Sequence, residues 1–145
     1  APIRTPISIA ELFTDLKKLF PEEEFQFEVP SPELKLNVDR TQIEQILINL
    51  LKNAREACSR KSDKKIQVKA RKLSAGNTTL TISDNGEGIL PDVLDKIFVP
   101  FFTTKTSGSG IGLSLCKQIM TLHEGSINVK SEVGKGSSFI LTFPK

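Results

Sequence analysis

Two asparagines stand four residues apart in the stretch NLLKNAREA, at Asn49 and Asn53. Residues at this spacing share one face of an α-helix. Asparagine is a poor helix former, because its side chain competes for backbone hydrogen bonds. A carboxamide oxygen is a hard, neutral ligand that suits Mg²⁺ when the ion also touches phosphate oxygens. The pair therefore indicates either a magnesium and phosphate site or two amides that face solvent or bond to their own helix.

An acidic residue with two nearby glycines lies in the stretch DNGEGI, at Asp84, Gly86 and Gly88. The alternation of the preceding residues points Asp84 inward, and a partly buried carboxylate needs a hydrogen-bond donor. The exocyclic amine of adenine is such a donor, and the glycines let the backbone lie close to a flat base. The same letters are also good β-turn chemistry, so the stretch predicts either a base-binding loop or a plain turn.

A lysine and a second glycine-rich segment follow. Lys105 closes the stretch FVPFFTTK, whose phenylalanines we interpret as a hydrophobic plug, and a lysine can reach a terminal phosphate as a point charge. Gly108, Gly110 and Gly112 run into a predicted helix, whose N-terminal N–H groups and dipole suit phosphate. The segment lacks both the β–α–β surroundings of a dinucleotide fingerprint and the Gly-Lys-Ser/Thr of a P-loop.

Hydrophobic periodicity predicts the elements that position these segments. The pattern gives helices over 7–21, 40–59 and 110–123, and strands over 24–30, 34–38, 65–73, 79–84, 126–132 and 137–143. The last four strands form two hairpins. On the third helix, Ile111, Leu115, Ile119 and Leu122 are predicted to face the core. The order predicts a two-layer α+β sandwich, with three helices on one face of a mixed, mostly antiparallel sheet.

Length and composition limit the class of protein. A chain of 145 residues fits one domain, and no apolar run approaches the roughly 20 residues of a membrane helix. The net charge of +3 is too small to indicate nucleic acid, and the basic stretch 59–65 is either a solvated turn or a docking patch. Cys58 and Cys116 lie far apart, which suits a reducing cytoplasm better than a disulfide framework. The start at Ala1 leads us to expect a fragment of a longer protein.

The order of the motifs resembles that of a known family. Asn-x-x-x-Asn-Ala, Asp-x-Gly-x-Gly, Phe-x-Pro-Phe, Gly-x-Gly-x-Gly-Leu and Gly-x-Gly-Ser-Ser-Phe follow one another between about residues 35 and 143. They resemble the N, G1, F, G2 and G3 boxes of the catalytic, ATP-binding domain of bacterial sensor histidine kinases. The resemblance implies a single domain over 1–145 with the Bergerat (GHKL) fold, which DNA gyrase, heat-shock chaperone ATPases and mismatch-repair ATPases share.

The resemblance also implies roles for the matching positions. Asn53 would ligate Mg²⁺, and Asn49 and Lys105 would serve catalysis at the phosphates. Asp84 would bond adenine N6, Ser138 would join that network through water, and residues 103–109 would form a short lid. The residues implied for ATP binding are Asn49, Asn53, Ala57, Asp84, Gly86, Gly88, Ile89, Thr104, Lys105, Gly108, Gly110, Ile111, Gly112, Leu113 and Ser138. The chain departs from the family at Glu56 and Ala57, where many members carry a basic and an aromatic residue.

Asn49 bears on the reaction type. The hydrolytic relatives carry a glutamate at this position, and an amide cannot act as a general base. The resemblance therefore implies slow hydrolysis, and transfer of the γ-phosphate of Mg-ATP to a histidine on an upstream helical dimerisation segment, without which the domain is inactive. Positioning and charge neutralisation would carry catalysis. We do not expect His123, the only histidine, to be the acceptor, and interpret it as a partly exposed helix-end residue.

Other readings remain open at this point. The same fold serves protein serine kinases of the anti-sigma type, and a nucleotide-binding scaffold without catalysis is a further alternative. The histidine kinase reading implies two partners, namely its own upstream phosphoacceptor domain and a downstream response regulator, and no nucleic acid. It also implies a cytoplasmic domain that is monomeric alone and belongs to a homodimer in the full-length kinase.

Overall fold

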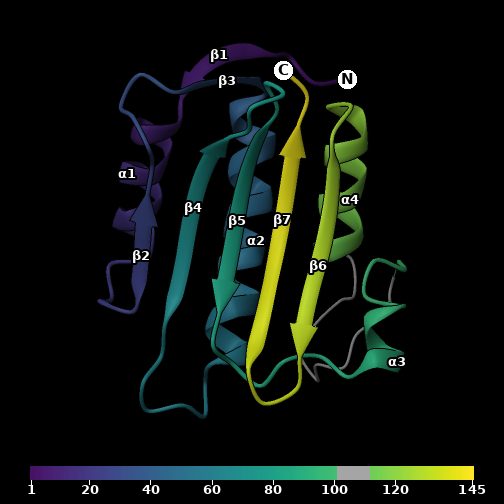
Figure 1. Cartoon of the computed structure of the whole chain (residues 1–145). Helices are drawn as coiled ribbons and strands as arrows, with labels where there is room; N and C mark the ends of the chain where they lie inside the picture. The colour runs from purple at the N-terminus through teal and green to yellow at the C-terminus, as the bar shows by residue number, and fades with distance from the viewer. Residues whose placement is uncertain (101–111) are drawn as a thin grey trace.

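One five-stranded sheet carries the helices on a single face (Figure 1). The computed structural model describes residues 1–100 and 112–145. The sheet has the order β2-β4-β5-β7-β6, and only the pairing of β2 with β4 is parallel. The strands are β2 (Phe25–Glu28), β4 (Ile66–Lys72), β5 (Thr78–Asp84), β6 (Ser126–Glu132) and β7 (Gly136–Phe143). The predicted mixed, mostly antiparallel sheet is confirmed, as are its two hairpins.

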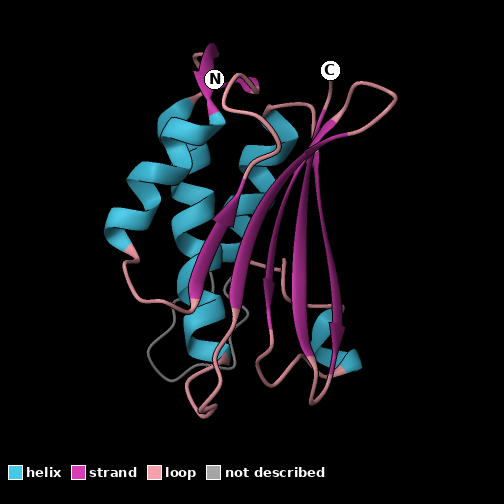
Figure 2. Cartoon of the chain, turned by 60° about the vertical axis from the view of Figure 1, so that its left-hand side comes forward, coloured by secondary structure: helices cyan, strands magenta, loops and turns pink. Residues whose placement is uncertain are grey.

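Helices α1 (Ile9–Leu19), α2 (Arg40–Ala57) and α4 (Gly112–Leu122) form the second layer, which Figure 2 shows beside the sheet. The side chain of Ser8 accepts a hydrogen bond from the N–H of Glu11 at the start of α1. Asp39 does the same for Gln42 at the start of α2. Such caps satisfy backbone donors that have no partner inside the helix. No helix within the described ranges is long and apolar enough to cross a membrane.

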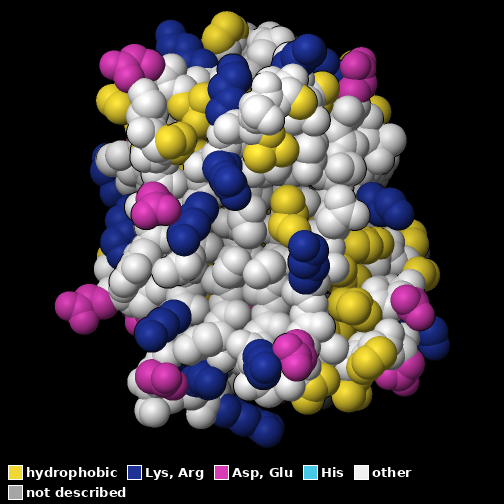
Figure 3. All heavy atoms as spheres, in the orientation of Figure 1, with side chains coloured by type: hydrophobic (Ala, Val, Ile, Leu, Met, Phe, Trp, Pro, Cys, Tyr) yellow, Lys and Arg dark blue, Asp and Glu magenta, His cyan; other side chains and the backbone are white. Residues whose placement is uncertain are grey.

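The core lies between the two layers. One stripe of α2 is buried, at Ile43, Ile46, Leu47, Leu50, Leu51 and Ala54. It packs against alternate residues of the strands, such as Leu80, Ile82 and Leu141. The opposite face of the sheet is open, and Figure 3 shows lysine and arginine side chains scattered over it. An antiparallel sheet with one covered face requires only this alternation of apolar and polar residues.

Two short elements were not predicted. A strand β1 (Thr5–Ser8) pairs antiparallel with β3 (Lys35–Val38) in a separate two-stranded sheet, so the predicted strand 34–38 exists but lies outside the main sheet. Four residues with a single buried side chain, Ile7, give β1 no recognisable period. A four-residue helix α3 (Pro91–Leu94) follows the first glycine-rich loop, and it too is below the length at which periodicity is informative.

The predicted core face of α4 is partly wrong. Ile119 is buried as predicted, but Leu115 and Leu122 are 36% and 46% exposed, and Cys116 and Met120 are buried instead. The residues 115, 119 and 122 and the residues 116, 119 and 120 both fit a helical period, so periodicity alone does not choose between them. Contacts of α4 with both α2 and β6 select the second set. Ile111 lies outside the described residues.

Candidate functional site

Asn49, Asn53 and Ala57 form a half-buried row along α2, beside its buried stripe. The side-chain amide of Asn49 lies 3.9 Å from the sulfur of Cys116 on α4. It is also the nearest atom to the space above Gly112, where an added Cβ would lie 3.8 Å from Nδ2. Asn49 therefore faces the start of α4, and we call Asn49, Gly112 and Cys116 the helix end of the site.

Asp84 closes β5 at the other end of this row. It is half-buried, and its Oδ1 accepts a hydrogen bond of 2.8 Å from the N–H of Gly86. Burial raises the pKa of the Asp84 carboxyl above its ordinary value, while backbone hydrogen bonds from Gly86 and Ser137 act in the opposite direction. Ser137 is the partner of Asp84 in the register of β5 and β7. We call Asp84, Gly86 and Ser137 the strand end of the site.

The glycine-rich loop after Asp84 is pressed between two other segments. A Cβ on Gly86 would lie 2.5 Å from the carbonyl oxygen of Ala57, which accepts the N–H of Glu87 at 3.1 Å. Gly88 has a φ of +78°, a conformation that L side chains rarely adopt, and its α-carbon faces the backbone of Glu132. The loop therefore joins the last turn of α2 to the hairpin of β6 and β7, and the predicted approach of its backbone to a base stays a prediction.

Ser138 lies away from the strand end, so its predicted role beside adenine stays a prediction that the position of its hydroxyl does not support. Its hydroxyl lies 2.8 Å from that of Ser83, and both belong to the face of the sheet opposite the helices, because side chains alternate along a strand. Ser137 shares the inward face with Phe139 and Asp84. The sequence held a signal for this, since Ser137, Phe139, Leu141 and Phe143 alternate.

A hydroxyl network beside the strand end was missed by the sequence analysis. The hydroxyls of Ser131 and Ser137 lie 2.8 Å apart, and Ser131 Oγ accepts a hydrogen bond of 2.8 Å from the N–H of Ile89. The network ties the predicted binding residue Ile89 to both strands of the second hairpin. Leu113, in the first turn of α4, is partly buried against the core.

The structure does not describe the remaining predicted site residues. Thr104, Lys105, Gly108, Gly110 and Ile111, together with the lid 103–109, lie outside the described residues. The basic stretch 59–65 is held as a turn by Asn85, whose side chain accepts from the N–H of Lys65 at 2.9 Å and donates to the carbonyl of Asp63 at 2.8 Å.

His123 is more enclosed than predicted, with 2% of its surface exposed. Its Nε2 accepts a hydrogen bond of 3.0 Å from the N–H of Asp39, and its Nδ1 lies 2.9 Å from the carbonyl oxygen of Ile119. A neutral ring that donates from Nδ1 satisfies both contacts. With both nitrogens bonded to the backbone inside the fold, His123 joins α4 to the start of α2.

The arrangement offers neutral ligands and one carboxylate. Asp84 and Asn49 lie at opposite ends of the row Asn49, Asn53 and Ala57. From Asn49 to Ala57 the helix rises about 12 Å at the usual 1.5 Å or so per residue. Within the described ranges no group of three or more His, Cys, Asp or Glu side chains has the placement to hold a metal ion. Amides that share a cation with phosphate oxygens fit such a site, because Mg²⁺ commonly takes few protein ligands beside substrate phosphates and water.

Comparison with known proteins agrees with this geometry. Residues 38–145 match the family described as histidine kinase-, DNA gyrase B-, and HSP90-like ATPase. The sensor histidine kinase ZraS of Salmonella typhimurium is 39% identical over 110 residues, which are 76% of this chain and 23% of that protein. The chain spans less than a quarter of the length of the curated relatives it matches.

Solved structures extend the likeness to the whole fold. The nucleotide-free catalytic domain of the histidine kinase ThkA is 35% identical, with a TM-score of 0.86 over 99% of this chain and 96% of that one. ThkA in complex with the response regulator TrrA gives 30% and 0.79, over 99% and 42% of the chains. Full-length ShkA in complex with AMPPNP gives 25% and 0.83, over 97% and 31%.

The resemblance inferred from the motifs is thereby confirmed, and so is the Bergerat (GHKL) fold. The chain belongs to the family of histidine kinase-, DNA gyrase B- and HSP90-like ATPases, and within it to the ATP-binding catalytic domains of sensor histidine kinases.

Proposed function

We propose that residues 1–145 form one catalytic domain that binds Mg-ATP and transfers the γ-phosphate to a histidine on a separate helical segment. The observation that carries the proposal is the row on α2, which leads from the half-buried carboxylate of Asp84 to the start of α4. Such a row suits a ligand with a hydrogen-bonding base at one end and an anionic group at the other.

The strand end is the proposed base site. Asp84 accepts the exocyclic amine of adenine, while its Oδ1 remains oriented by the N–H of Gly86. The absence of a side chain at Gly86 lets the loop that follows Asp84 lie against the last turn of α2. Ser137, buried next to Asp84, is the hydroxyl that we assign to the base site in place of Ser138.

The helix end is the proposed phosphate site. Asn53 and Asn49 would supply amide oxygens, and the N-terminal turn of α4, which begins at Gly112, would offer backbone N–H groups and the positive end of the helix dipole to a phosphate. Bound Mg²⁺ would supply neutralisation of phosphate charge. Lys105, Thr104, Gly108, Gly110 and Ile111 remain predicted contributors from the segment outside the described residues.

The helix end favours transfer to a protein over hydrolysis. The amide of Asn49 does not accept a proton near neutral pH. Its neighbour Cys116 is no base either, because burial raises the pKa of that thiol to about 11. Because neither of these two described side chains activates water, we infer that positioning and charge neutralisation carry the reaction and that the nucleophile comes from another segment.

The partners follow from the class of protein. In the longer kinase we propose a homodimer through the acceptor segment, and passage of the phosphate to a response regulator, as the ThkA–TrrA complex suggests by analogy. We place the domain in the cytoplasm, where both cysteines remain reduced, consistent with their burial as free thiols.

Calorimetry of the 145-residue domain with Mg-ATP tests the proposal. Wild type should bind, and Asp84→Asn should weaken binding at least about tenfold, since a hydrogen bond to a charged group contributes about 1.5–3 kcal/mol. Asp92→Asn, an exposed carboxylate on α3, serves as the matched control and should bind as wild type does. No heat from wild type, or equal affinity for the two variants, would refute the base site. Acid lability of the phosphate on the acceptor distinguishes histidine from serine transfer.

A further inference from the structure

Asn85 extends the ladder of β4 and β5 by one residue beyond its last pair. That pair is Ile66 with Asp84, at the strand end of the site. The N–H of Asn85 then donates to the carbonyl of Lys65 at 3.2 Å, and its side-chain oxygen accepts the N–H of Lys65 at 2.9 Å. One asparagine therefore satisfies both backbone groups of Lys65 at the point where the strands stop pairing.

The side-chain amide of Asn85 also holds the turn over residues 58–65, which joins α2 to β4. Its Nδ2 donates to the carbonyl of Asp63 at 2.8 Å. Sγ of Cys58, the residue that caps the end of α2, donates to Oδ1 at 3.6 Å. An amide that donates and accepts at once replaces a peptide group in these contacts, which an apolar side chain does not do.

The end of the ladder beside Asp84 depends on these bonds. On one side Asp84 pairs with Ser137 of β7, and on the other side its pairing with Ile66 is the last of the register. Strand ends open readily, because few contacts hold them. The N–H of Gly86 orients the carboxylate but belongs to the same loop, so this bond does not tie the loop to β4. The contacts of Asn85 supply that tie.

We propose that Asn85 is a positioning residue for the base site, which holds the carboxylate of Asp84 where adenine meets it. This inference rests on the proposed function, in which Asp84 accepts the exocyclic amine of adenine. Asn85 acts through Asp84, because its own donor and acceptor atoms are engaged by the turn. Hydrogen bonds weaken steeply with distance and angle, so a displaced carboxylate loses the base and leaves the phosphate contacts as they are.

Calorimetry of the 145-residue domain with Mg-ATP and with Mg-GTP tests the inference. Asn85→Ala should weaken Mg-ATP binding about tenfold, within the range of coupling between residues in contact. It should weaken Mg-GTP binding less than about twofold, because guanine presents a carbonyl oxygen where adenine has its amine. Asn85→Asp keeps an acceptor for Lys65 and loses the donor to Asp63, so its loss of Mg-ATP affinity should be intermediate.

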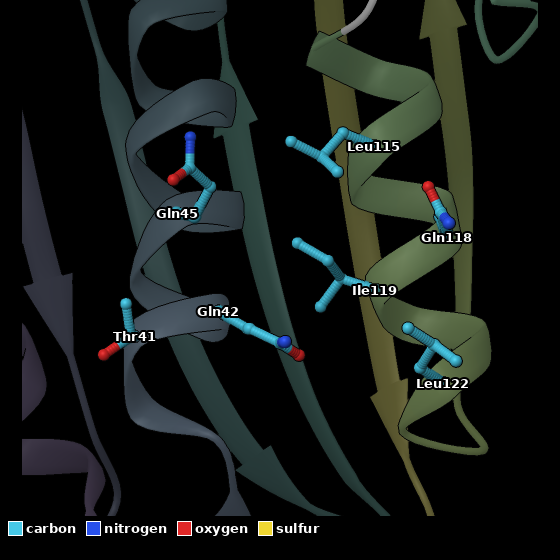
Figure 4. A pocket seen from close by; sticks show the side chains of 7 residues that line it. All are labelled: Thr41, Gln42, Gln45, Leu115, Gln118, Ile119 and Leu122. Carbon is cyan, nitrogen blue, oxygen red and sulfur yellow. The ribbon is translucent and has the colours of Figure 1, made fainter. Parts of the chain in front are cut away.

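A double-mutant cycle and two controls separate positioning from a loss of stability. In an Asp84→Asn background, Asn85→Ala should change Mg-ATP affinity less than about twofold, because the carboxylate on which it acts is gone. Ile9→Val, in the core under α1, lowers stability through a small cavity and should bind Mg-ATP as wild type does. Gln45→Ala removes an amide from the groove between α2 and α4 (Figure 4) and should also bind normally.

The outcomes distinguish this inference from the proposed function. Wild type that binds no Mg-ATP refutes both. Equal Mg-ATP affinity of wild type and Asn85→Ala, with weak binding by Asp84→Asn, refutes the positioning role alone. Equal losses for Mg-ATP and Mg-GTP, or in both backgrounds, refute it as well. If Asn85→Ala does not fold, Asn85→Asp decides, because wild-type affinity overturns the inference and a loss confined to Mg-ATP supports it.

Discussion

At the strand end of the site, backbone lies against backbone, with a Cβ on Gly86 only 2.5 Å from the carbonyl of Ala57. At the helix end, a Cβ on Gly112 would meet, among the residues that the structure describes, nothing nearer than Nδ2 of Asn49 at 3.8 Å. The difference teaches that the strand end, which is the proposed base site, is fixed by the fold, whereas the described residues surround Gly112 less tightly at the proposed phosphate site.

Substitution of Gly86 and of Gly112 by alanine is the most direct test of the difference in packing between the strand end and the helix end. Gly86→Ala forces backbone apart and should lower the free energy of unfolding by about 2–3 kcal/mol, the upper range for overpacking. The Cβ of Gly112→Ala would make only an ordinary contact with the described residues in the first turn of α4. This variant should change the free energy of unfolding by less than about 1 kcal/mol, because alanine also has the higher helix propensity. Urea denaturation of both variants measures the difference. Equal stability of the pair would show that the strand end is not pressed against α2.

Much of the fold and part of the candidate site were predictable from the sequence, and the predictions that failed have physical causes. The long periodic segments predicted α2, the two hairpins and the two-layer sandwich correctly. A regular apolar period that continues over many residues fits only one type of secondary structure. The core face of α4 was misjudged because Leu115 and Cys116 both fit a helical period, and only packing against α2 and β6 separates them. Ser138 was chosen over Ser137 although the alternation up to Phe143 places Ser137 on the inward face, which is the face of Asp84 in the structure.

A smaller effect should come from the two adjacent serines. Ser137→Ala removes a buried hydroxyl 2.8 Å from Ser131, and should cost about 1 kcal/mol of stability, the usual net worth of a hydrogen bond, with weaker Mg-ATP binding. Ser138→Ala, on the open face with Ser83, should leave Mg-ATP affinity as it is. Thermal unfolding and calorimetry on both variants measure this. Loss of affinity in Ser138→Ala alone would restore the original assignment.

The smallest effect concerns the carboxyl of Asp84 itself, because two backbone hydrogen bonds oppose the cost of its burial. Burial raises the pKa of this carboxyl in the folded state above its ordinary value of 3.8, so the unfolded chain releases the proton at lower pH than the folded chain does. The protonated form of Asp84 therefore stabilises the folded state relative to the ionised form. This stabilisation is present in full below pH 3.8 and is lost as the pH rises through the folded pKa of Asp84. At neutral pH the ionised side chain destabilises the fold, and Asp84→Asn removes that cost.

Asp84→Asn should accordingly be slightly more stable than wild type at pH 7, with the advantage shrinking as the pH falls toward 4. Urea unfolding of both proteins across this range measures it, and Asp92→Asn, an exposed carboxylate, should show no such trend. A variant less stable than wild type at pH 7 would mean that the hydrogen bonds at Asp84 outweigh its desolvation. Joined with weakened nucleotide binding, a gain in stability would mean that the strand end retains a buried charge for its ligand at the expense of the fold.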